Sequence, residues 1–74
     1  MNFKMSNKIN KIFGKNLRKF RKKKCLTQEV LAFKANLDRT YIGRIERGER
    51  NISLAVAERI ANALQIDIKE FFTE

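Results

Sequence analysis

The apolar residues of this chain recur at steps of three and four along most of its length, and no proline interrupts the pattern. The first run consists of Ile9, Ile12, Phe13, Leu17 and Phe20. This spacing places all five side chains on one face of a helix, whereas the strict alternation typical of strands is weak throughout. The pattern therefore predicts an all-α fold.

Four capping residues divide the rest of the pattern. Thr27, Asp38, Ser53 and Asp67 each precede an apolar run, and side chains of these types cap helix N-termini. Asn36 ends the second run, because asparagine tolerates the left-handed conformation that closes many helices. We therefore expect five helices, at about 8–23, 27–36, 38–47, 53–64 and 67–72.

A chain of 74 residues forms one domain, which we place at residues 8–74 behind an N-terminal tail of residues 1–7. A domain of this size buries only ~60% of its unfolded surface, so a partner subunit would add useful stability. Beyond the first helix, we expect these residues to face the core: Val30, Leu31, Ala35, Ile42, Ile45, Leu54, Ala57 (or Val56), Ile60, Ala61 and Leu64.

The net charge is +9, and it is unevenly distributed. Residues 1–25 hold ten lysines and arginines and no acid, whereas residues 51–74 hold two basic and four acidic residues. Such a gradient predicts a basic face directed at a polyanion. With one cysteine and no histidine, the chain offers no zinc cluster and little for catalysis, so we expect no enzyme activity, metal or cofactor.

The third predicted helix carries the functional pattern. Only Asn36, Leu37 and Asp38 separate it from the second, which is the spacing of a helix-turn-helix, at about residues 27–47. Because Ile42 and Ile45 face the core, the polar residues point outward. These are Arg39, Thr40, Gly43, Arg44 and Arg47.

The outward residues suit the major groove of double-stranded DNA. Arg39 and Thr40 lie in the first turn, and Arg44 lies one turn further on the same face. Arginine can donate two hydrogen bonds to guanine, and threonine offers a hydroxyl and a methyl group. We expect these three residues to contact bases, with Gly43 allowing close approach to the duplex.

The segment TQEVLAFKANLDRTYIGRIERGERNISL resembles the helix-turn-helix of the lambda-repressor/Cro (Xre) class of regulators. Within that class it most resembles the controller proteins of restriction–modification systems, over roughly residues 9–72. The resemblance implies a compact five-helix, lambda-repressor-like domain, base contacts from Arg39, Thr40 and Arg44, and a partly buried ion pair between Arg21 and Glu46. It also implies DNA phosphate contacts from Thr27, Gln28, Tyr41, Arg47, Arg50 and Asn51.

Two residues depart from the family pattern. Cys25 and Asn36 stand where many relatives have glycine. Asparagine keeps the turn, but cysteine at a positive φ is strained. We therefore expect Cys25 to avoid that conformation and to pack as a small side chain.

The C-terminal segment predicts a homodimer. Phe71 and Phe72 are adjacent, so they cannot both face one core. We expect a two-fold seam from residues of this end, and two recognition helices ~34 Å apart would then match a palindromic operator. The candidates for the seam are Phe71 or Phe72, together with Ile68, Leu64 or Ile66.

The sequence thus predicts a cytoplasmic regulator that binds operator DNA, and its resemblance to controller proteins implies autoregulation. Other readings are an antitoxin-type or phage-type repressor that also binds a protein through its C-terminal helices. RNA binding lacks a stacking surface, because Tyr41 is the only evident exposed aromatic. No apolar run approaches the ~20 residues that span a membrane, and the stripe of residues 8–24 is needed for the core rather than for a membrane surface.

Overall fold

Four α-helices and one short 3-10 helix make up the fold of the computed structural model, which describes residues 3–74, with side chains from Lys8 onward. The elements are α1 (Phe3–Lys23), α2 (Gln28–Ala35), α3 (Arg39–Glu46), α4 (Leu54–Leu64) and η1 (Ile68–Phe72). No strand occurs between residues 3 and 74, so the all-helical class is confirmed. The fifth predicted α-helix is wrong in type, because this segment forms only a 3-10 helix.

The four predicted N-caps all form. The side chain of Thr27 accepts a hydrogen bond from the Val30 N–H at 3.1 Å, and Asp38, Ser53 and Asp67 make the equivalent bond for their helices. These bonds satisfy N–H groups that the first helical turn leaves unpaired. The predicted start of the first helix differs from the structure. α1 begins at Phe3 rather than near Lys8, since no helix breaker lies between them.

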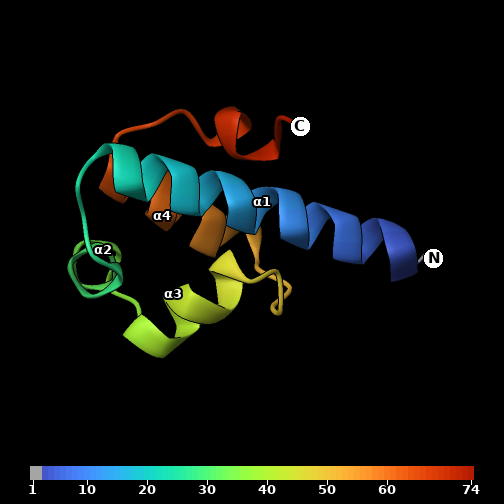
Figure 1. Cartoon of the computed structure of the whole chain (residues 1–74), viewed down its shortest axis with the longest axis horizontal. Helices are drawn as coiled ribbons and strands as arrows, with labels where there is room; N and C mark the ends of the chain where they lie inside the picture. Colours follow the sequence, from blue (N-terminus) through green and yellow to red (C-terminus); the bar gives the residue numbers. More distant parts are fainter. Residues whose placement is uncertain (1–2) are drawn as a thin grey trace.

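The core lies around α1, which crosses the molecule between α3 on one side and η1 on the other, with α4 behind it (Figure 1). Phe13 stacks on Phe71 with 5.1 Å between ring centroids, and Phe20 meets Phe71 edge-on at the same distance. The fully buried residues of large volume are Phe13, Phe71, Leu17, Leu31, Ile42, Ile45, Ile60 and Leu64.

A buried asparagine fastens η1 to α1. The Asn16 Nδ2 group donates to the carbonyl oxygens of Phe71 at 2.9 Å and Thr73 at 2.8 Å. These carbonyls lie at the end of η1, where no further helical turn supplies donors. The contact holds the end of η1 against α1.

Three predicted core residues are exposed instead. Ile9 is 49% exposed, Val30 is 41% exposed and Leu54 is 77% exposed. In α2, Leu31, Ala32 and Ala35 turn inward, which leaves Val30 and Phe33 on the outer face. Phe33 is 86% exposed while Tyr41 is half-buried, so the expectation that Tyr41 is the exposed aromatic was also wrong.

The prediction for Cys25 is wrong. Cys25 has a φ of 58°, in the left-handed region, and its side chain is exposed. Its N–H donates to the Lys22 carbonyl at 2.9 Å, and the Leu26 N–H donates to the Arg21 carbonyl at 3.1 Å. This pair of bonds closes α1 in the usual way for a left-handed cap, and it outweighs the strain of a side chain at that φ. The predicted left-handed cap at Asn36 is confirmed, with a φ of 56°.

Candidate nucleic-acid interface

The outer face of α3 presents three exposed polar side chains. Ile42 and Ile45 are buried on the inner face, and Asp38 caps the helix with a 2.9 Å bond from the Thr40 N–H. Because α3 is fixed in this rotation, its opposite face is open to solvent. The predicted base-contacting residues Arg39, Thr40 and Arg44 are all exposed there.

Gly43 differs from this set. It is buried, and the side chains of Gln28 and Arg47 lie over it. A Cβ atom on Gly43 would lie 3.3 Å from Arg47 Nη1 and 3.7 Å from Gln28 Oε1. The expectation that Gly43 faces outward to admit the duplex was therefore wrong. Its missing side chain instead leaves room for two other side chains.

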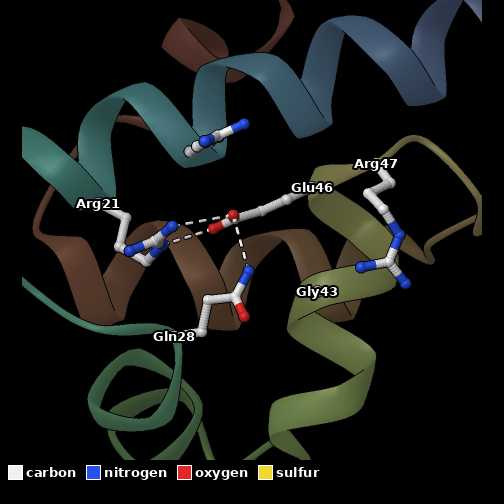
Figure 2. A pocket seen from close by; sticks show the side chains of 6 residues that line it. Arg21, Gln28, Gly43, Glu46 and Arg47 are labelled. Atoms are coloured by element: carbon white, nitrogen blue, oxygen red, sulfur yellow. Dashed lines mark hydrogen bonds and ion pairs between the residues drawn. The ribbon is translucent and has the colours of Figure 1, made fainter.

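Arg21 and Glu46 join α1 to the end of α3 (Figure 2). Arg21 donates from Nε to Glu46 Oε2 at 2.6 Å and from Nη2 to Oε1 at 3.0 Å. Its Nη1 donates to the Leu26 carbonyl at 2.8 Å, which adds the start of the helix-turn-helix to the same network. The hydrogen bond to Glu46 raises the pKa of Arg21, with partial burial acting in the opposite direction, so this arginine stays charged.

Gln28 is the third member of the network. Its Nε2 donates to Glu46 Oε1 at 3.1 Å, so α1, α2 and α3 meet at one carboxylate. Figure 2 shows Gln28 reaching from the start of α2 toward Glu46, with Gly43 and Arg47 on the neighbouring helix. A hollow of about 250 Å³ lies here, lined by Arg18, Arg21, Gln28, Gly43, Glu46 and Arg47. Apart from Glu46, its charged residues are arginines, which suits an anion.

A glycine lets α1 approach α3 this closely. A Cβ atom on Gly14 would lie 2.2 Å from the Ile45 carbonyl oxygen and 2.8 Å from that of Glu46. Any side chain at this position would therefore force the two helices apart. Sequence reasoning missed Gly14, although a glycine inside a strongly periodic helix is a signal of close packing.

The segment after α3 carries the remaining candidates. Arg47 donates from Nε to Glu49 Oε2 at 2.9 Å, and this hydrogen bond lowers the pKa of Glu49. The Arg50 guanidinium lies 5.2 Å from the centre of the Tyr41 ring. Asn51 accepts a 2.6 Å hydrogen bond from Asn10 of α1. The predicted phosphate-contacting residues of this segment are thus held by weak surface contacts beside α3.

Two residues that position the site were not foreseen. Arg59 of α4 donates to the carbonyl oxygens of Ala35 and Asn36, which close α2. It thereby ties the turn of the helix-turn-helix to the body of the domain. Arg18 of α1 lines the hollow beside Gln28 and Arg47. An arginine among so many basic residues gives no local signal of either role.

The predicted dimer residues divide into two groups. Leu64 and Phe71 are fully buried in the protomer, so their side chains are not available to a partner and these two alternatives were wrong. Ile66 and Ile68 are half-buried against the core, and Phe72 is 41% exposed. Any seam at this end therefore uses the second group.

Between residues 3 and 74, none of the helices combines the length and the apolar composition of a membrane span. In the same part of the chain, no three histidine, cysteine or acidic residues gather in a way that would hold a metal ion.

Known proteins resemble this chain in sequence and structure. The helix-turn-helix family matches residues 17–71. Control protein C.BamHI of Bacillus amyloliquefaciens is 46% identical over 89% of this chain and 83% of its own length. The restriction-modification controller protein C.AhdI from Aeromonas hydrophila has a crystal structure that matches with a TM-score of 0.83 and 48% identity, over 85% of this chain and 96% of that one. The immunity repressor of Bacillus phage phi105 is 43% identical over 82% of this chain, which spans 42% of that repressor.

Proposed function

The chain belongs to the helix-turn-helix family of transcription regulators and is related to the control proteins of restriction–modification systems, and we propose that it binds a specific palindromic operator as a homodimer. The observation that carries this proposal is the outer face of α3. Arg39, Thr40 and Arg44 are exposed together on a helix whose rotation is fixed by buried isoleucines and by the ion pair at its end.

We assign base recognition to these three side chains. Arg39 and Thr40 lie in the first turn of α3, where recognition helices contact base edges. Arginine pairs best with guanine, through O6 and N7, so we expect guanines opposite Arg39 and Arg44. A helix held rigidly presents these donors with little loss of conformational entropy on binding.

Phosphate contacts would then flank the recognition helix on two sides. Gln28 lies at the N-terminus of α2, where the helix dipole favours an anion, and Thr27 caps that helix. On the other side lies the segment after α3. Its proposed contacts are Tyr41, Arg47, Arg50 and Asn51.

The homodimer would use the apolar residues left open at the C-terminal end. Ile66, Ile68 and Phe72 are partly exposed, and residues 51–74 carry two basic and four acidic residues, a net charge of −2. An isologous contact here would set two α3 helices one DNA turn apart. Analytical ultracentrifugation tests this step, with Phe72→Asp expected to weaken the dimer and Lys69→Ala expected to leave it intact.

The biological role follows from the relatives. We propose that the protein acts in the cytoplasm, controls its own promoter and times the expression of a restriction–modification system. Its similarity to the phi105 immunity repressor supports a second candidate, a phage-type repressor. Neighbouring genes distinguish them, because an endonuclease gene favours the first candidate and phage genes favour the second.

Binding to the DNA upstream of the gene tests the proposed function. Wild type should bind this duplex tightly and a scrambled duplex weakly. Arg39→Ala should lose ~1–3 kcal/mol on the specific duplex and little on the scrambled one. Lys69→Ala removes one charge from η1 and serves as the control, with little effect on either duplex. Equal losses from the two variants would contradict base reading by α3.

A further inference from the structure

Four basic residues form a stripe along α1. Lys11, Lys15, Arg18 and Lys22 are spaced by four, three and four residues, so they share one face of the helix. All four side chains are exposed. We call this group the α1 basic stripe.

The stripe lies beside the edge of α1 that contacts α3 and the segment after it. Gly14 marks this edge, since it meets the carbonyl oxygens of Ile45 and Glu46. Lys11 packs on Gly48, where an added Cβ would lie 2.8 Å from Lys11 Cγ. The backbone and the Cγ atom of Lys11 therefore lie next to the segment that we assign to phosphate binding.

Arg18 has a similar neighbourhood about two turns further along α1. It lines the same hollow as Gln28 and Arg47. Both of those residues are proposed phosphate contacts. Lys11 and Arg18 thus adjoin the proposed DNA surface at two separate points, and Lys15 and Lys22 continue the same face.

The charge of the stripe is not neutralised. Between residues 8 and 74, no carboxylate forms an ion pair with any of its four side chains. The acidic residues of the C-terminal segment lie with η1, on the other side of α1 from α3 (Figure 1). The stripe therefore keeps four positive charges next to the recognition helix.

We propose that the α1 basic stripe is a second phosphate-binding track, which extends the DNA footprint past the helix-turn-helix onto the first helix. This inference rests on the proposed function, because it takes α3 as the helix in the major groove. From Lys11 to Lys22, α1 rises ~16 Å, whereas phosphates recur every ~3.4 Å along the axis of each strand. The stripe is therefore long enough to meet several phosphates, and it binds them irrespective of base sequence.

The salt dependence of DNA binding tests the track. The stripe variant is Lys11→Gln with Arg18→Gln. The control variant is Lys23→Gln with Lys69→Gln, which removes the same charge. Lys23 lies half a helical turn round α1 from Gly14, and Lys69 lies on η1. Binding of each variant to the upstream duplex and to a scrambled duplex is measured over a range of salt concentrations.

Contact with phosphate predicts a change of slope. The stripe variant should lower the slope of log K against log[salt] by ~0.9 for each lost contact, on both duplexes, and weaken binding on the order of tenfold per contact at 0.1 M salt. The control variant should keep the wild-type slope. Lys11→Arg with Arg18→Lys retains the charges and should restore it, which excludes misfolding as the cause.

Equal slopes for the stripe and control variants would overturn the phosphate-binding track. The α1 basic stripe would then attract DNA only through its overall charge. This failure differs from failure of the proposed function. There, wild type would bind both duplexes alike and Arg39→Ala would have no selective effect, yet the slopes of the stripe and control variants would still be readable on the scrambled duplex.

Discussion

Glu46 and Glu49 each bind an arginine beside the end of α3, at similar distances but with very different exposure. Arg21 Nε lies 2.6 Å from Glu46, and the two side chains are 11% and 4% exposed. Arg47 Nε lies 2.9 Å from Glu49, and there the side chains are 59% and 52% exposed. Glu46 also accepts from Gln28, whereas the Glu49 carboxylate accepts side-chain hydrogen bonds from Arg47, with the charge of Arg44 also acting on it.

The difference in exposure separates two regions. We call the buried Arg21–Glu46 pair with Gln28 the fixed region, and the exposed Arg47–Glu49 pair the adjustable pair. The Arg21–Glu46 pair lies where α1, α2 and α3 meet, so its loss leaves a charge with little access to water. The Arg47–Glu49 pair is surrounded by solvent, where an ion pair contributes little. The first pair therefore ties α1 and α2 to the end of α3. Under the proposed function, the second pair can exchange Glu49 for a DNA phosphate.

The largest effect is expected from Glu46→Ala. It leaves the guanidinium of Arg21 without its carboxylate and removes the acceptor of Gln28, so the free energy of unfolding should fall by about 3 kcal/mol. Urea denaturation measures the change. Glu49→Ala is the matched control and should leave the midpoint of unfolding where it is in wild type. Equal effects of the two variants would remove the distinction between the regions.

A second comparison uses two glycines. Gly14→Ala brings a Cβ against two backbone carbonyls of α3, and overpacking of this kind costs about 2 kcal/mol. Gly43→Ala meets only the ends of the Arg47 and Gln28 side chains, which can move, and alanine favours a helix by up to ~1 kcal/mol over glycine. Thermal unfolding should therefore show a lower melting temperature for Gly14→Ala and a higher one for Gly43→Ala than for wild type. Destabilisation by both would mean that the Gln28 and Arg47 side chains are as rigid as backbone.

Cys25 lies next to Leu26, whose carbonyl oxygen accepts a hydrogen bond from Arg21 of the fixed region, and its backbone strain can be tested by substitution. Its φ of 58° suits glycine, and the Leu26 carbonyl that follows accepts from Arg21. Cys25→Gly should relieve the strain and raise the free energy of unfolding by about 1 kcal/mol. Asn36→Gly, at a φ of 56°, should gain less, because asparagine already tolerates this conformation. Denaturant unfolding of the two variants gives the ranking, and a larger gain at Asn36 would contradict it.

Local rules account for what the sequence predicted correctly. The N-caps at Thr27, Asp38, Ser53 and Asp67 and the left-handed Asn36 depend on neighbours a few residues away. Periodicity was strong enough in α3 to orient its buried isoleucines. It failed in α2, where apolar residues occur all round the helix, so Val30 and Leu31 were not distinguishable by pattern alone.

Contacts between distant residues account for what was missed. Asn16 binds carbonyls at Phe71 and Thr73, and Arg59 binds those of Ala35 and Asn36. No spacing rule links such pairs in one sequence. The Cys25 prediction failed for a different and local reason, since two hydrogen bonds at the end of α1 outweighed the preference of the residue itself.

The adjustable pair predicts an effect on DNA binding. Glu49 competes with phosphate for Arg47, so Glu49→Gln should raise affinity about two- to fivefold on the upstream and scrambled duplexes alike. Glu58→Gln, an exposed acid on α4, controls for the change in net charge. Fluorescence anisotropy measures both. An equal gain from Glu58→Gln would assign the effect to net charge rather than to Arg47.

The smallest effect is the titration of Glu49 itself. In the free protein the hydrogen bond from Arg47 lowers the pKa of Glu49 below its ordinary value of 4.5. The pair therefore stabilises the fold fully above that value, and its contribution is lost as the pH falls through the lowered pKa.

If phosphate takes over Arg47, the pKa of Glu49 should rise in the complex. The complex then binds more protons than the free protein between the two pKa values, so affinity should increase slightly as the pH falls through this range. Carboxyl carbon NMR of Glu49, with and without the duplex, measures both pKa values. A Glu49 pKa that stays low on DNA would show that Arg47 keeps its carboxylate and does not bind phosphate.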